Sequence, residues 1–292
     1  MQNSTEFLKK FHLNILIIKN KTEEMEVPGG HNNTVFVLLS ELLGTAFIMM
    51  AVNWGGVSDA TPQCVGFTVF MLIQLFGQVS GGHFNPAVTL AMLFKEGKQN
   101  WMRNFTFTIT IIIAQGIGAA LGTAITAGGF SFEKHGDAKK ITEGGYHVTQ
   151  LCPSNGCNDG GDLIPKVLFC EAVCTFLFVS MVLMVVKHNG SEQMPINALV
   201  IGMSLFLAIQ MASGISGGCI NPAVGLFQSM FQKFANTKIF PNAPETQVTY
   251  IPCYVGGPFL GGFIAGMWHK WIHEKAVSSA DDCRNEEYDK MI

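Results

Sequence analysis

Six long apolar segments dominate this chain of 292 residues and restrict the folds that it can adopt. They cover residues 34–54, 62–79, 104–127, 164–187, 195–213 and 248–272. A helix needs roughly 20 apolar residues to cross the hydrocarbon core of a bilayer, and each segment is close to that length. In lipid, only helices and closed barrels satisfy all their backbone hydrogen bonds. The runs are too continuous for the alternating strands of a barrel, so they predict six transmembrane helices.

The composition agrees with a membrane protein. Hydrophobic residues make up 48% of the chain and charged residues 13%, whereas a soluble domain carries roughly a quarter charged residues. The net charge of −3 gives no basic face of the kind that nucleic acid requires. The predicted partner is therefore the lipid bilayer, with no nucleic acid.

The eight cysteines contain no C-x-x-C pair, so neither a metal site nor a cofactor is predicted. Cys152 and Cys157 share a loop rich in Gly and Asn. They could form a disulfide if that loop faces an oxidising compartment.

Two shorter apolar runs, 86–95 and 222–233, each begin inside an Asn-Pro-Ala triplet. The triplets are Asn85, Pro86 and Ala87 in the first half, and Asn221, Pro222 and Ala223 in the second. Asn is a strong N-cap, and Pro is favoured at the first helical position. Since both runs are too short to span a bilayer, they predict half-helices that enter the membrane and stop.

The triplets belong to an internal repeat. Residues 80–88 (SGGHFNPAV) match residues 216–224 (SGGCINPAV) at seven of nine positions, with an offset of 136. Glu41 and Thr45 likewise match Glu171 and Thr175, with an offset of 130. Because each half has three spans, the second half must insert upside down, and such inverted repeats place a functional site at the midplane. A purely structural duplication is the alternative.

The segments give a domain organisation and an orientation. We expect an N-terminal segment at 1–33, a first repeat at 34–127, a connecting loop at 128–163, a second repeat at 164–272 and a tail at 273–292. Twelve Lys and Arg fall on the side of both termini and six on the other, which places both termini in the cytoplasm. Residues 7–18 are either a helix on the membrane surface or a poorly ordered tail.

On these features the sequence resembles the aquaporin, or major intrinsic protein, family over roughly residues 34–272. The likeness rests on both triplets, on the Glu positions of the first and fourth spans, and on the GPFLGG sequence at 257–262. It implies an all-α membrane protein with six transmembrane helices and two re-entrant half-helices in an inverted repeat. It also implies a passive pore in each subunit, assembly as a homotetramer and no enzymatic activity.

The resemblance also assigns roles to residues. Asn85 and Asn221 would cap the half-helices and offer amide donors to the lumen, while the positive helix ends repel cations and hinder proton hopping. Glu41 and Glu171 would brace the re-entrant loops, with proton relay as the alternative. A ladder of backbone carbonyl acceptors would come from Gly81, Gly82, His83, Gly217, Gly218 and Cys219. The His83 ring is either a gate that responds to protonation or a neutral ring packed between loop and helix.

The narrow constriction can be placed by its spacing from the two Asn residues in the family. The four positions are Val65, Ile209, Gly218 and Val224. Water channels of the family have Arg where this chain has Val224, and aromatic or His residues where it has Val65 and Ile209. Without Arg the wall loses a charge and five donors. This set of four constriction residues resembles that of the plant vacuolar subgroup. It predicts a pore that passes water and small neutral solutes such as glycerol, urea, ammonia or hydrogen peroxide.

Other functions remain to be separated from this one. No nucleophile, base and orienting group occur at a recognisable spacing, so no catalytic residue is predicted. No ring of charged residues favours an ion channel. A non-conducting relative that acts as a membrane junction or scaffold would share the same fold. The sequence leaves open whether the membrane is the plasma membrane or an intracellular vacuolar one.

Overall fold

The computed structural model describes residues 30–55, 60–96, 101–129, 151, 153, 161–188, 194–238 and 249–280. The chain separates into two units, Met1–Val37 and Leu38–Ile292. All contacts given below lie within the second unit. The expected surface helix at 7–18, most of the loop at 128–163 and the Cys152–Cys157 pair fall outside the described residues.

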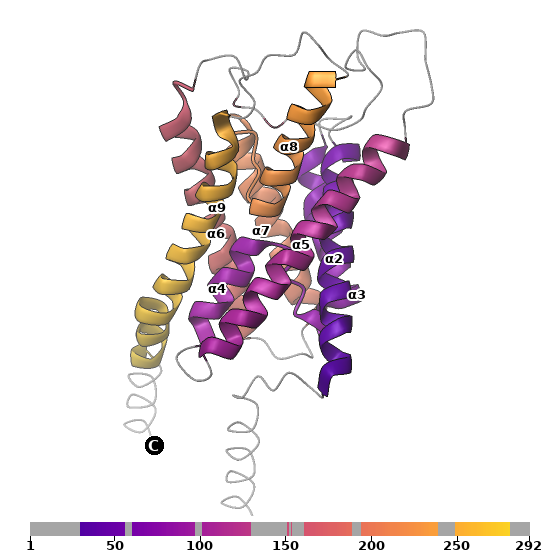
Figure 1. Cartoon of the computed structure of the whole chain (residues 1–292). Coiled ribbons are helices and arrows are strands. Elements are labelled where there is room, and N and C mark those ends of the chain that lie inside the picture. The colour runs from indigo at the N-terminus through magenta and orange to yellow at the C-terminus, as the bar shows by residue number, and fades with distance from the viewer. Residues whose placement is uncertain are drawn as a thin grey trace, which may run out of the picture. The chain divides into compact units, whose positions relative to one another are not determined.

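Every regular element in the described ranges is helical, which confirms the all-α prediction. The long helices are α2 (Gly30–Gly55), α3 (Thr61–Ser80), α5 (Trp101–Gly129), α6 (Ile164–His188), α7 (Met194–Ser213) and α9 (Ile251–Trp268) (Figure 1). They coincide with the six predicted spans. The first five are long and apolar enough to cross a membrane by length and composition.

The last helix runs further than its apolar sequence. After α9 the chain passes through a π-helical turn, η4 (His269–His273), and stays helical to residue 280, beyond the predicted end at 272. Glu274 and Lys275 are good helix formers. A criterion based on hydrophobicity alone therefore ends the helix too early.

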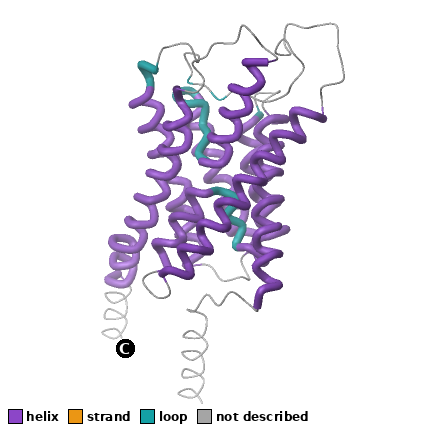
Figure 2. The backbone as a smooth tube through the Cα atoms, viewed as in Figure 1, coloured by secondary structure: helices purple, strands orange, loops and turns teal. Residues whose placement is uncertain are grey.

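Two short helices follow the triplets, as the sequence predicts. They are α4 (Pro86–Glu96) and α8 (Pro222–Lys238). Figure 1 shows them in opposite halves of the bundle, and Figure 2 shows the non-helical segments that lead into them among the long helices. Helix α8 extends five residues beyond the predicted end at 233, because polar residues continue it after the apolar run.

Close helix crossings hold the two repeats together. Helices α3 and α7 meet at Gly66 and Gly202, where a Cβ added to Gly66 would lie 2.7 Å from the Gly202 carbonyl oxygen. A Cβ on Gly202 would lie 2.5 Å from the Gly66 carbonyl oxygen. The two glycines differ by the repeat offset of 136, so the crossing joins equivalent points of the two halves. Small residues permit such close approach of helices in lipid.

Candidate functional site: the two re-entrant loops

The segments before the triplets share one backbone pattern. Gly81 and Gly82 have φ values of 85° and 67°, and Gly217 and Gly218 have values of 92° and 74°. These conformations favour glycine. Phe84 (49°) and Ile220 (56°) also have positive φ, which is costly for side chains of this size. Such residues persist only where their surroundings fix them.

Glu41 supplies the surroundings of the first loop. Its Oε1 accepts hydrogen bonds from the Ser80 hydroxyl (2.7 Å) and the His83 amide (2.9 Å). Its Oε2 accepts from the Phe84 amide (2.7 Å) and from Gln115 Nε2 (2.8 Å). The side chain is fully buried. Because the donors come from both sides of the Gly81–Gly82 turn, these bonds fix the loop that carries Phe84.

Glu171 has the same relation to the second loop. Its Oε1 accepts from the Ser216 hydroxyl (2.6 Å) and the Cys219 amide (2.9 Å), and its Oε2 accepts from the Ile220 amide (2.8 Å). It is also fully buried. Each Glu therefore contacts the loop of its own half. The hydrogen bonds to both carboxylates come from donors of the protein itself, which favours the predicted bracing role.

The two triplets are joined across the centre of the molecule. The Asn85 Oδ1 accepts from the Ala87 amide (2.9 Å), and the Asn221 Oδ1 accepts from the Ala223 amide (3.0 Å), so each side chain caps its own half-helix. Asn85 Nδ2 donates to the Ile220 carbonyl, and Asn221 Nδ2 donates to the Phe84 carbonyl, both at 3.0 Å. The positive-φ residues thus aim their carbonyls at the opposite half. An amide nitrogen carries two hydrogens, and each cross-bond uses one.

The segments expected to present carbonyl acceptors are partly accessible. Gly82, His83, Gly217 and Gly218 have intermediate exposure and Gly81 is exposed, whereas Cys219 is buried. The Cys219 sulfur donates to the Asn221 carbonyl (3.1 Å) and lies 3.9 Å from the Tyr254 carbonyl of α9. Its thiol therefore packs against α9.

The His83 ring lies against α4. Its Nδ1 is 3.3 Å from the Thr89 hydroxyl, which donates to the Asn85 carbonyl (3.1 Å). Gln115 Nε2 donates to the same hydroxyl oxygen at 2.9 Å. The ring thus contacts α4, and its role as a gate or as a packed neutral ring stays a prediction.

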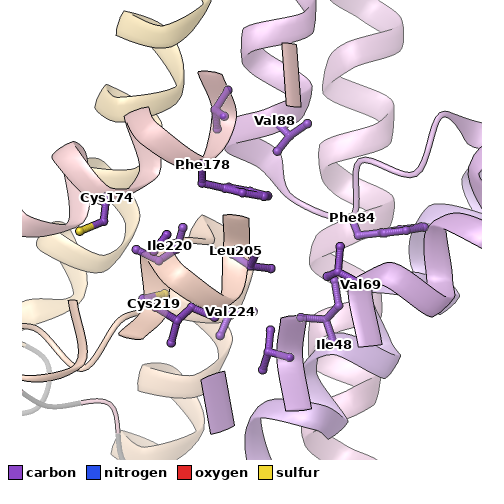
Figure 3. Close-up of a cluster of buried hydrophobic side chains, with 14 of the residues drawn as sticks. Ile48, Val69, Phe84, Val88, Cys174, Phe178, Leu205, Cys219, Ile220 and Val224 are labelled. Carbon is purple, nitrogen blue, oxygen red and sulfur yellow. The ribbon is translucent and has the colours of Figure 1, made fainter. Parts of the chain in front are cut away.

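The four predicted constriction residues come from four different segments of the second unit. Val65 lies on α3, Ile209 on α7, Gly218 in the second loop and Val224 on α8. Val65, Ile209 and Val224 belong to one cluster of buried hydrophobic side chains, and Figure 3 shows Val224 in it beside Ile220 and Leu205. Gly218 lies directly on Ile209, since a Cβ at Gly218 would be 2.7 Å from the Ile209 carbonyl oxygen. A larger residue at 218 would therefore displace the backbone of α7.

Several residues of this network were not singled out in the sequence. Ser80 and Ser216, which donate to the two Glu side chains, lie inside the repeated nine residues, so the repeat itself was a signal for them. Gln115 and Thr89 have no such signal, because the equivalent positions of the second repeat are occupied by other residue types. Tyr254, whose hydroxyl donates to the Ser216 carbonyl (2.6 Å), looks in sequence like an ordinary aromatic residue of a span.

Within the part of the chain that the structure describes, no group of three or more His, Cys, Asp and Glu side chains could hold a metal ion.

A sequence model described as "Major intrinsic protein" matches residues 32–269. The chain belongs to this family. Helix content, apolar spans and family membership together make it an integral, multi-pass membrane protein. The likeness of its constriction to the plant vacuolar subgroup stays a prediction.

Similar proteins include a glycerol uptake facilitator protein and several aquaporins. The chain is 30% identical over 223 residues to "Glycerol uptake facilitator protein-like 6" of Lactiplantibacillus plantarum, covering 76% of this chain and 88% of that one. It is 26% identical to aquaporin-4 of Bos taurus, covering 82% of this chain but only 64% of that relative. It is 28% identical to aquaporin AqpM of Methanothermobacter marburgensis, covering 75% of this chain and 79% of the relative.

The fold has a solved counterpart. The X-ray structure of the aquaglyceroporin from Plasmodium falciparum superposes with a TM-score of 0.65, covering 84% of this chain and 99% of that one at 18% identity. At that identity the likeness concerns the fold alone, and it confirms the predicted aquaporin-like architecture.

Proposed function

We propose that this protein is a passive transmembrane channel for water and small neutral solutes that excludes protons and ions. The observation that carries the proposal is the pair of crossed amides, in which Asn85 and Asn221 each cap a half-helix and reach the opposite loop. The family is one of membrane transport proteins rather than enzymes, and relatives named as aquaporins and as a glycerol facilitator support the same reading.

Electrostatics at the crossed amides favours exclusion of charge. Helices α4 and α8 both begin at the triplets, so two positive helix ends meet at one place. The remaining amide hydrogens of Asn85 and Asn221 offer donors only. The oxygen of a water molecule at this point accepts hydrogen bonds from the two amides and cannot also accept one from the next water molecule. This interrupts proton transfer along a single file of water molecules. Cations meet a positive potential at the same point.

The constriction favours a broad range of neutral solutes. Val65, Ile209 and Val224 present no side-chain donor or acceptor, and Gly218 presents only backbone. Without the charge and donors of an Arg at 224, discrimination depends on size. We propose glycerol, urea, ammonia and hydrogen peroxide as the class of permitted solutes besides water.

The setting of the channel belongs to the same proposal. The distribution of Lys and Arg supports cytoplasmic termini. Gln74 of α3 and Gln210 of α7, which also differ by 136, are both exposed on the single chain. Exposed amides on spanning helices are costly in lipid unless another helix satisfies them. This supports assembly with further copies, as the homotetramer.

The test is an osmotic experiment on the purified full chain in lipid vesicles. Stopped-flow light scattering measures water and solute permeability, and an internal pH dye measures proton leak. We expect water permeability several-fold above that of protein-free vesicles, measurable glycerol flux, and proton leak equal to the empty control. The number of correctly folded protein copies per vesicle is measured separately. If that protein moves neither water nor any of the four solutes, it is a non-conducting scaffold.

A further inference from the structure

Three buried polar side chains link α8, α2 and α5. Gln228 Nε2 of α8 donates to Asn53 Oδ1 of α2 at 2.6 Å. Asn53 Nδ2 then donates to the Thr126 hydroxyl of α5 at 2.8 Å. The Thr126 hydroxyl donates in turn to the Gly122 carbonyl at 3.0 Å. We call Gln228, Asn53 and Thr126 the polar clamp.

The polar clamp is a directional chain inside the protein. Each member donates to the next, and the last ends on a backbone carbonyl, so the groups polarise one another in one direction. Gln228 and Asn53 are each 1% exposed and Thr126 is not exposed at all. The clamp therefore does not touch solute, and any influence on transport must act through the helices that it joins.

The clamp lies one helical turn from a constriction residue. Gln228 follows Val224 by four residues, so the two side chains lie on the same face of α8. Helix α8 also rests on α9 at Gly225, where a Cβ would lie 2.5 Å from the Tyr254 carbonyl oxygen. Val224 thus lies on a half-helix that is held both by close packing against α9 and by the clamp.

The first half has no equivalent of this arrangement. By the repeat offsets, Asn53 corresponds to Leu183 of α6 and Gln228 to Met92 of α4. Both are buried hydrophobic residues. The corresponding positions of α4 and α6 are therefore apolar, and α4 has its polar contact at another place, between Thr89 and Gln115 of α5. The hydrogen bonds of the clamp join α8 of the second repeat to α2 and α5 of the first, and the apolar side chains of Met92 and Leu183 can form no such bonds. Packing by itself does not require them.

We propose that Asn53, Thr126 and Gln228 are positioning residues that hold α8 in register and thereby set the width of the constriction at Val224. The inference rests on the proposed channel function. Apolar contacts between helices are non-directional, whereas a hydrogen bond has a narrow range of distance and angle. The clamp fixes α8 along and around its axis, whereas the constriction wall, made of Val65, Ile209 and Val224, has no polar side chain to do so.

The test replaces the clamp by the residues that the first half uses. The double variant Asn53→Leu, Gln228→Met keeps apolar volume and removes both interhelical hydrogen bonds. Water and glycerol permeabilities are measured in vesicles and expressed as their ratio, which cancels the number of channels. We expect the glycerol-to-water ratio to change by roughly three- to tenfold, the rate equivalent of a lost buried hydrogen bond. The single variant Thr126→Val should change it in the same direction by less.

A control and a restored variant separate positioning from stability. Thr123→Val removes a buried α5 hydroxyl that donates to the Ala119 carbonyl of its own helix, and it should leave the ratio unchanged. Exchanging the two amides, Asn53→Gln with Gln228→Asn, should restore the ratio toward the wild-type value. A clamp-free protein with lower thermal stability but an unaltered ratio would overturn the inference, as would an altered ratio in Thr123→Val. If the double variant does not fold, Thr126→Val alone decides by the same criterion.

Failure of the inference is distinguishable from failure of the proposed function. Wild-type vesicles without water or solute flux would refute the channel. Wild-type vesicles that conduct, together with an unchanged ratio in the clamp variants, would refute only the positioning role.

Discussion

Val224 is the residue at which this chain departs most from the water channels that it resembles. It is the third residue after Asn221, and it is almost fully buried in the hydrophobic cluster that also contains Val65 and Ile209. A cation at this point would repel other cations and supply donors. In the proposed channel the apolar wall would leave charge selection to the crossed amides, so that different residues would select size and exclude charge.

Replacing Val224 by Arg should bring these functions together. The longer side chain occupies lumen and adds a positive charge, so glycerol permeability should fall by about an order of magnitude while water permeability changes little. Stopped-flow measurements of both solutes on the same vesicles provide the comparison. Val224→Leu adds volume without charge and should lower glycerol flux less. Unaltered glycerol flux in the Arg variant would show that Val224 is not part of the constriction.

At the scale of elements, the half-helices depend on the helices that surround them. Glu41 and Glu171 fix the loops, and glycines let the long helices approach closely enough to enclose them. The crossing of α3 and α7 is the closest of these contacts to the predicted constriction. Val65 is the neighbour of Gly66 on α3, and Ile209 follows Gly202 by seven residues on α7. A wider crossing would move Val65 and Ile209 apart.

Gly66→Ala should therefore destabilise the fold. The added Cβ would lie 2.7 Å from both the Gly202 carbonyl oxygen and Phe206 Cβ, and relieving such an overlap costs about 1–3 kcal/mol. Thermal unfolding of the purified protein in detergent measures the loss. Gly214→Ala is the matched control, since a Cβ there meets nothing within 4 Å. Equal unfolding temperatures for the two variants would contradict the close crossing.

Across the whole molecule, some features could be predicted from the sequence and others could not. Length and hydropathy predicted the spans, and the repeated nine residues predicted both half-helices and the inverted arrangement. The contacts of Glu41 and Glu171 with the re-entrant loops were implied by the family resemblance. The polar clamp could not be predicted, because Asn53 and Gln228 correspond to Leu183 and Met92 in the repeat, and these apolar residues give no sign of a hydrogen bond. Helix ends at 238 and 280 were missed, since polar residues continue a helix without any hydropathic signal.

Assembly belongs to this scale, and the exposed amides of Gln74 and Gln210 provide its test. If copies of the chain satisfy these groups, removing both should weaken the association. Interhelical hydrogen bonds in membranes contribute about 0.6–2 kcal/mol each, so Gln74→Leu with Gln210→Leu should increase the monomer fraction severalfold at low protein-to-detergent ratio. Native mass spectrometry measures the distribution, and Met71→Leu on the same exposed face of α3 serves as a control without a polar group.

A tetramer as stable as that of the wild type would exclude the two amides from the subunit contacts, and a wild-type monomer would refute the homotetramer itself. Since the two repeats contribute one glutamine each, either single variant should produce part of the effect.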